Sequence, residues 1–421
     1  MTVTRSIGFW TAVAIVMGNM IGSGVFLLPA SLAPFGGLAF GGWLISAGGA
    51  MALALVFARL ARENPAAGGI YAYSRAAFGD LAGFLVGWGY WTAVWAGCAA
   101  LAIALVGYLD PIIPNVVRNP VSAAAIEIGA VWLLTLVNLR GVANAGRLQV
   151  VTTALKVLPL LVIGIAGIAV LNPANFAIPS PGPGGMGTLG TLMAAANLTM
   201  WALMGLETAT IPADAVREPD RTIPRATITG TALAAVIYIV STGGVMGALG
   251  PEALAHTTAP FADAARRFFG DGGAVIVAIG GVISCFGALN GWILIQGQLP
   301  VPVARDGLFP KAFGRLNSRG VPVFPLVLGS VLSSVLIAAN SSRGLVSLFT
   351  FVIQLSTLST LVPYVFCSLA GFMRGRRSVA GVIAFLFSMF AIAGAGPEVV
   401  YYGFLLLLAG LPIYVWVKRQ A

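Results

Sequence analysis

A glycine-rich interruption in the first apolar segment constrains the fold of this chain more than any other feature. The segment runs from about residue 7 to residue 32 and reads GNMIGSG over positions 18–24. Each glycine weakens a helix by roughly 1 kcal/mol relative to alanine, and every backbone group freed inside hydrocarbon needs a new partner. The interruption therefore indicates either unwound backbone beside a protein-lined cavity or close helix packing through small residues.

Unwound backbone at this position would carry binding chemistry of its own. Free amides would begin one half-helix, where the helix dipole is positive, and free carbonyls would end the other half-helix. Such a pair of ends suits a zwitterion with a carboxylate and an ammonium group.

The chain is far more apolar than a soluble protein. Of its 421 residues, 58% are hydrophobic and 9% are charged, whereas a soluble domain is about 25% charged. No polar stretch is long enough to form a soluble domain, so residues 1–421 are predicted to form one transmembrane domain in the lipid bilayer. The first apolar run is expected to stay in the protein because it lacks a convincing cleavage site.

The polar and sulfur-containing residues argue against several function classes. Cys98, Cys285 and Cys367 lie in apolar stretches without metal-type spacing, so we expect buried thiols and no disulfide, metal or cofactor. The net charge of +10 comes from short loops rather than a basic arm, which argues against nucleic acid as a partner. One histidine, no intramembrane acidic pair and no phosphate-binding loop argue against an enzyme and against a nucleotide-driven pump.

Twelve hydrophobic runs predict an all-α membrane protein with twelve transmembrane helices. The runs lie near 7–32, 38–58, 81–109, 121–139, 148–171, 188–212, 226–249, 272–300, 322–340, 343–373, 378–396 and 398–417. With the N-terminus placed in the cytoplasm, most of the 23 Lys and Arg residues fall in inside segments. The positive-inside rule therefore predicts that both termini are cytoplasmic.

A second interruption lies in the sixth run, over Trp201–Thr208, five runs after the first. An odd offset turns the second half upside down relative to the first, as in inverted-repeat transporters whose two broken helices meet at a midplane site. This pattern predicts a first repeat over 1–171, a second over 188–373 and two peripheral helices over 378–417. Packing kinks at both places are the alternative.

Three charged residues lie away from the ends of predicted spans. Glu207 lies three residues beyond Met204 and is expected about one turn into the second half-helix; it is a functional-site hypothesis by default, with a cap on the broken helix as the alternative. Lys156 is either buried or long enough to snorkel to the interface. Glu127 lies nearer the outer end of its span and is expected to reach the interface as a structural residue.

Several motifs in order resemble one transporter family. They are the break at 22–24, the segment 201–207, the loop 68–73 (GGIYAY), and the dipeptides Glu218-Pro219, Gly291-Trp292 and Pro363-Tyr364. The chain resembles the amino acid, polyamine and organocation transporter superfamily, in its basic amino acid/polyamine antiporter branch, and is similar to arginine/agmatine antiporters. The resemblance implies a five-plus-five inverted-repeat core, alternating access, the bacterial inner membrane and a possible homodimer.

The resemblance also implies roles for individual residues. The carboxylate of a small amino acid substrate would meet Ser23 and the amides around Gly24, and its ammonium would meet carbonyls near Met20, Trp201 and Met204. Trp292 would stack on the cationic head group, worth roughly 1 to 2 kcal/mol when desolvated. The resemblance further implies that Ser356 makes a polar contact and that Glu207 is a proton-sensing acid. It also implies that Tyr90, Tyr364 and Trp201 are gating aromatics.

Two departures leave the substrate open. Cys98 stands where those antiporters have a guanidinium-binding Asn, and Lys156 resembles a lysine of sodium-independent amino acid transporters, where an ammonium replaces a bound sodium ion. The first hypothesis is an antiporter of cationic amino acids and their amines. The alternative is a sodium-independent, possibly proton-coupled transporter of neutral amino acids, and a channel is the competing class.

Overall fold

The computed structural model describes residues 5–109, 112–113, 115, 119–257, 259–340, 345–373, 375 and 378–420, and within these ranges the side chains of residues 340 and 345–356 are left out. The regular elements of these ranges are all helical, and one isolated bridge joins Ile7 to Val216. The prediction of an all-α protein is therefore confirmed for the described part of the chain.

The first half of the chain contains seven α-helices. In order they are α1 (Phe9–Met20), α2 (Gly24–Leu32), α3 (Leu38–Glu63), α4 (Ile70–Phe78), α5 (Asp80–Leu109), α6 (Pro120–Leu139) and α7 (Val142–Ala169).

The second half contains ten more described α-helices, several of them short. In order they are α8 (Thr188–Ala202), α9 (Pro219–Leu249), α10 (Pro251–Ala255), α11 (Pro260–Gln298), α12 (Pro300–Arg305), α13 (Val323–Asn340), α14 (Leu345–Met373), α15 (Val379–Gly394), α16 (Pro397–Leu408) and α17 (Leu411–Gln420).

The helices have the length and composition of a multi-pass membrane protein. In the described ranges, seven are long and apolar enough to cross a bilayer, and the bent pair α1–α2 makes an eighth. Shorter apolar helices lie at Val323–Ala339, Thr357–Met373 and Val379–Gly394. Each predicted hydrophobic run thus contains helix, although the count of twelve spans stays a prediction.

The first predicted break is present in the structure. Helix α1 ends at Met20, α2 begins at Gly24, and the chain bends by 47° between them. The three residues between the two helices have no helical assignment, so the glycines end one helix and permit another to start in a new direction.

The second break is longer than predicted. Helix α8 ends at Ala202, and up to α9 the chain makes only turns and the 3₁₀-helices η4 (Thr208–Thr210) and η5 (Ala213–Ala215). Gly205 has a φ of +101°, which right-handed helix excludes. The expectation that Glu207 lies one turn into a second half-helix is therefore wrong, because Glu207 lies in a turn.

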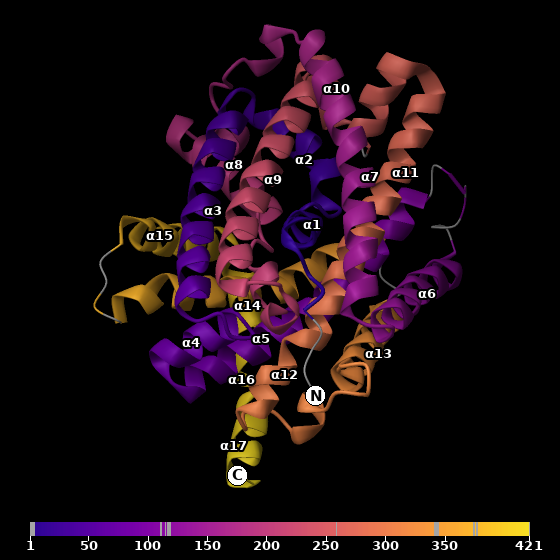
Figure 1. The fold of residues 1–421 in the computed structure, drawn as a ribbon. Coiled ribbons are helices and arrows are strands. Elements are labelled where there is room, and N and C mark those ends of the chain that lie inside the picture. The colour runs from indigo at the N-terminus through magenta and orange to yellow at the C-terminus, as the bar shows by residue number, and fades with distance from the viewer. Residues whose placement is uncertain are drawn as a thin grey trace.

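Helix α1 lies in the middle of the bundle. It contacts α7, α9 and α11, and Figure 1 shows it between α9 on one side and α7 and α11 on the other. Helix α3 packs along both α8 and α9, and α5 packs along α11 and α14. The broken backbone is therefore surrounded by protein rather than by lipid.

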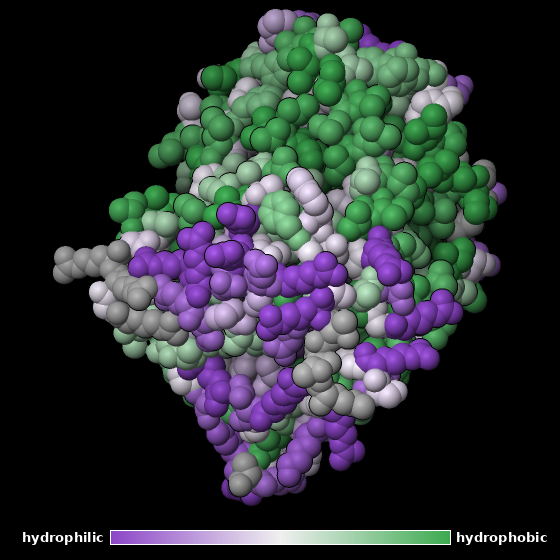
Figure 2. Space-filling view, viewed as in Figure 1, coloured by the Kyte–Doolittle hydropathy of each residue, from purple (hydrophilic) through white to green (hydrophobic). Residues whose placement is uncertain are grey.

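One end of the molecule is markedly more polar than the rest. Figure 1 shows both ends of the chain, together with α4, α12 and α17, toward the lower end of the view, and Figure 2 shows hydrophilic side chains gathered there beneath a mostly hydrophobic surface. Ion pairs join these elements: Arg75 binds Asp80 (2.8 Å) and Asp306 (2.7 Å), and Lys418 binds Asp80 (2.7 Å). The polar end thus ties α4, α12 and α17 together.

Close packing of α3 on α8 depends on glycine. A Cβ atom on Gly42 would lie 2.7 Å from the carbonyl carbon of Ala195, whereas one on Gly48 of the same helix would have no other atom within 4 Å. We predict that Gly42→Ala lowers the free energy of unfolding by about 1–3 kcal/mol through overpacking, and that Gly48→Ala leaves it equal or slightly raises it. Thermal unfolding of the purified variants in detergent measures this, and equal midpoints for both would contradict the packing argument.

Candidate functional site

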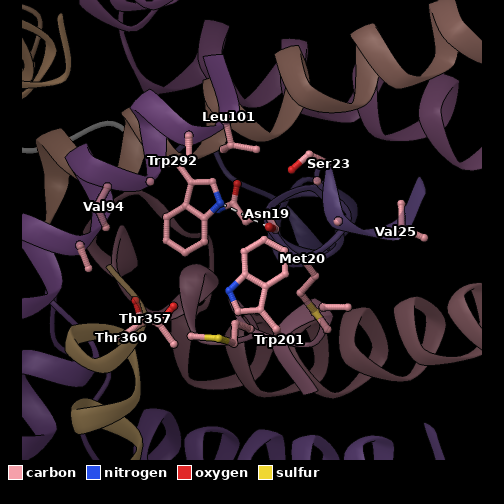
Figure 3. Close-up of a pocket in the computed structure, with 17 residues that line it drawn as sticks. Asn19, Met20, Ser23, Val25, Val94, Leu101, Trp201, Trp292, Thr357 and Thr360 are labelled. Carbon is pink, nitrogen blue, oxygen red and sulfur yellow. Dashed lines mark hydrogen bonds between the residues drawn. The ribbon is translucent and has the colours of Figure 1, made fainter. Parts of the chain in front are cut away.

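A cavity of about 110 Å³ lies where the α1–α2 break meets four other elements. The walls come from the break, from α5, from the end of α8, from α11 and from α14, and Figure 3 shows Trp201 and Trp292 on facing sides of it. The lining residues are Asn19, Met20, Gly22, Ser23, Gly24, Val25, Ala93, Val94, Gly97, Ala100, Leu101, Trp201, Ala202, Met204, Trp292, Thr357 and Thr360.

The structure brings most of the predicted substrate-binding residues to this cavity. Those that line it are Met20, Ser23, Gly24, Trp201, Met204 and Trp292. Cys98 is fully buried in α5 and lies outside the lining, to which α5 contributes Gly97 and neighbours on the same face. The side chain of Ser356 belongs to the part of α14 that the structure leaves out.

The start of α2 presents backbone amides to the cavity. Gly24 is the first residue of α2, and no side chain caps this helix end. The first amides of a helix have no partner within the helix and lie at the positive end of its dipole. Trp201 lies directly over this end, since a Cβ atom on Gly24 would come within 2.5 Å of its Cζ3 atom. Only glycine leaves room for the indole here.

Lys156 of α7 binds the carbonyls on the other side of the break. Its ammonium donates hydrogen bonds to the carbonyl of Gly18 (2.6 Å) and to that of Ile21, and the whole side chain is buried. The alternative in which Lys156 snorkels to the interface is therefore wrong. The positive charge instead fixes the unwound end of α1 by direct hydrogen bonds.

Other helices donate to the remaining carbonyls of the break. Tyr238 of α9 donates to Met20 (2.7 Å), Ser284 of α11 to Gly22 (3.0 Å), Tyr108 of α5 to Ser23 (3.0 Å) and Trp292 of α11 to Asn19 (3.3 Å). Figure 3 shows the bond between Trp292 and Asn19 at the cavity wall. The protein thus supplies donors to this run of carbonyls, including the Met20 carbonyl expected to meet the substrate.

Glu207 forms a buried cluster with two tyrosines from other helices. The hydroxyl groups of Tyr90 on α5 and Tyr364 on α14 both donate to its carboxylate. The Tyr364 hydroxyl also accepts the amide of Gly205 (3.1 Å), and the ring of Tyr90 lies 6.3 Å from that of Trp292. Glu207 does not cap the following 3₁₀-helix. The cluster therefore links the second break to a wall of the cavity without lining it.

Three polar lining residues escaped the sequence interpretation as site residues. Asn19 is part of the glycine-rich motif, yet its side chain was not singled out, and neither amide atom has a hydrogen-bond partner in the described structure. Thr357 and Thr360 lie one turn apart on α14. Their helical spacing on one face is the signal that could have identified them.

Glu127 lies in a different environment from the one expected. The side chain is 2% exposed rather than reaching the interface. In the described ranges, no group of three or more His, Cys, Asp or Glu residues could hold a metal ion.

Comparisons with known proteins point to transport. The profile of a family described as amino acid permease matches residues 7–414. The chain is 36% identical to a cadaverine/lysine antiporter of Escherichia coli strain K12 over 86% of this chain and 82% of that protein. It is 34% identical to a putative arginine/ornithine antiporter of Bacillus subtilis, over 99% and 98%, and 31% identical to the putrescine transporter PotE of Escherichia coli, over 95% and 93%.

The lysine at the break gives a test of this geometry. We predict that Lys156→Met lowers the midpoint of thermal unfolding, because it removes the side-chain donor of the Gly18 carbonyl and leaves the Ile21 carbonyl with Ser284 alone, at about 1–3 kcal/mol for a buried carbonyl left unpaired. Lys311→Met, which changes an exposed lysine, serves as the control and should leave the midpoint in place. Equal midpoints for Lys156→Met and the parent protein would show that these hydrogen bonds do not stabilise the break.

Proposed function

Because this chain belongs to the amino acid permease family, we propose that it exchanges cationic amino acids for related amines across a bacterial inner membrane by alternating access. It is a transporter and not an enzyme. The observation that carries the proposal is the cavity at the broken helix, with uncapped amides of α2 at one side and two tryptophans facing each other. The antiporters to which the chain is similar support the choice of cationic substrates.

The two ends of the cavity suit the two ends of an amino acid. The substrate carboxylate binds Ser23 and the amides around Gly24, at the positive end of α2. The α-ammonium binds near Met20 and at the end of α8, where carbonyls near Trp201 and Met204 lie at the negative end of that helix dipole. Tyr238 already donates to the Met20 carbonyl and the amide of Met204 to the Trp201 carbonyl (3.3 Å), so the ammonium shares these acceptors with donors of the protein.

The side-chain cation binds the aromatic wall. Trp292 stacks on the cationic head group, and Ser356 adds a polar contact from α14, with Thr357 and Thr360 beside it. Cys98 affects binding of the side-chain cation indirectly. It lies behind the cavity lining, next to the lining residue Gly97. Trp201 closes the cavity over Gly24 on one side, and Tyr90 and Tyr364 gate it on the side of Glu207.

Lys156 makes the transporter independent of sodium. Its ammonium donates hydrogen bonds to carbonyls of the break, which would otherwise be free to coordinate a bound cation. Coupling to protons then falls to Glu207, which sits between the two tyrosines of the gate.

We propose twelve membrane spans for the whole chain. Residues 1–171 form the first repeat, residues 188–373 the inverted second repeat, and residues 378–417 two peripheral helices. The breaks within the first and sixth spans support this division. The basic loops and the shared end of the two termini support a cytoplasmic location for both. Two copies associate as a homodimer in the bilayer.

Counterflow in proteoliposomes tests the function. We predict rapid uptake of labelled arginine or lysine only when the vesicles contain a cationic amino acid or its amine. Trp292→Ala should weaken apparent substrate affinity by about 5- to 30-fold, the equivalent of the roughly 1–2 kcal/mol of a desolvated cation–π contact. Trp416→Ala is the control, because Trp416 is 52% exposed, and it should keep the apparent substrate affinity of the parent protein.

The second candidate function is exchange of neutral amino acids. No charged side chain stands among the described residues that line the cavity, and Cys98 brings no polar amide to the layer behind it. Active protein that exchanges alanine and takes up no arginine or lysine would establish this second function and reject the first. A steady ionic current without counterflow would instead identify a channel.

The acid at the gate gives a prediction for pH. Because a carboxyl group loses its proton as pH rises, we predict that exchange by the parent protein falls from acidic toward neutral pH, whereas Glu207→Gln, which mimics the protonated form, shows a weaker dependence on pH. Glu252→Gln changes an exposed residue of α10 and should keep the parent profile. A parent-like profile in Glu207→Gln would remove Glu207 from proton coupling.

A further inference from the structure

Glu127 is a buried carboxylate that the proposed transport cycle does not use. It lies on α6 and is 2% exposed. Within the described structure its carboxylate makes no hydrogen bond and no ion pair, unlike Glu207, which accepts from two tyrosines. The neighbours one turn away on α6, Ala123 and Val131, are buried as well, so this face of α6 is turned into the protein.

The surroundings of Glu127 are apolar. Helix α6 packs against α5, α7, α11 and α13. Ala123 and Ala130, on either side of Glu127, belong to a cluster with Leu105 and Val106 of α5 and Cys285 of α11. A carboxylate in such a place has lost nearly all contact with water and has no hydrogen-bond or ion-pair partner in the described structure.

The titratable groups on the packed helices do not compensate a negative charge. Tyr108 of α5 shares the cluster, but its hydroxyl donates to Ser23. Cys285 of α11 is a buried thiol, and Lys156 of α7 gives its ammonium to the carbonyls of the break. Helix α13 has no titratable residue. An ionised Glu127 would therefore be an isolated charge, which costs several kcal/mol even after relaxation.

We propose that Glu127 is a proton-binding site of the transporter. In the conformation described here the carboxyl group is neutral and holds a proton taken from water. When α6 separates from α5 and α11, water reaches the group and the proton leaves, so that a carboxylate and a hydrated proton are formed. Glu127 thus couples protonation to the packing of α6, at a place separate from the Glu207 cluster.

Infrared spectroscopy of the full-length protein in liposomes tests the protonation state directly. A neutral carboxyl group has a carbonyl absorption distinct from that of a carboxylate. We expect the spectrum at neutral pH to contain a protonated-carboxyl band that survives in Glu207→Gln and in the exposed control Glu252→Gln and disappears in Glu127→Gln. Because this readout needs no substrate, it is independent of the proposed exchange function.

The same measurement can overturn the proposal in two ways. Absence of a protonated-carboxyl band in the parent protein at neutral pH would mean that Glu127 is ionised. A band that persists in both Glu127→Gln and the double variant with Glu207→Gln would belong to another residue, and would also reject the assignment.

Coupling to conformation needs a second readout. We expect addition of a transported substrate to change the intensity of the Glu127 band, as α6 changes its packing during the cycle. The pH profile of exchange should differ between Glu127→Gln and the parent, while Glu127→Asp, which keeps a carboxyl, should restore a pH-dependent profile. An unchanged band with substrate and an unchanged profile in Glu127→Gln would reduce Glu127 to a structural role.

Discussion

Hydrogen bonds to the unwound carbonyls of α1 are the interaction on which the rest of the structure depends. Hydrocarbon offers no water to a broken helix, so each exposed backbone group needs a protein partner. Donors reach this one segment from α5, α7, α9 and α11, through Tyr108, Lys156, Tyr238 and Ser284. The need to satisfy a few carbonyls therefore fixes how four helices surround α1, and the cavity forms beside the place where they converge.

The two sides of the break differ in their hydrogen bonding. The carbonyl side is filled by the protein's own donors, one of them charged, while the amide side at the start of α2 has no side-chain cap. The open side faces the cavity beneath Trp201. This asymmetry favours an anionic group at one end of the ligand, which is what an amino acid brings and a simple amine lacks. When an amino acid is exchanged for an amine, the amine does not make the contact between a carboxylate and the amides of α2.

Sequence reasoning succeeded where a local rule decides the outcome. Clustered glycines end α1, and their position brings Met20, Ser23 and Gly24 to the wall of the cavity. Sequence reasoning failed where the rotation of a helix about its axis decides which residues face the cavity or the core. Successive residues of a helix point about 100° apart, so Gly97 lines the cavity and Cys98 does not. The burial of Glu127 likewise depends on which face of α6 meets α5 and α11, a matter of tertiary packing that one sequence cannot settle.

Recognition of a cation without an acid in the described cavity lining fits the work of an exchanger. A buried carboxylate in direct contact would hold a cationic ligand tightly in every conformation and would remain as an uncompensated charge once the ligand left. An aromatic face contributes only about 1–2 kcal/mol and is stable when empty. Glu207 lies behind the wall, hydrogen-bonded to Tyr90 and Tyr364, so the described cavity lining itself stays neutral. Under the proposed function, the acid influences the gate from there, and release of the substrate does not require the breaking of an ion pair.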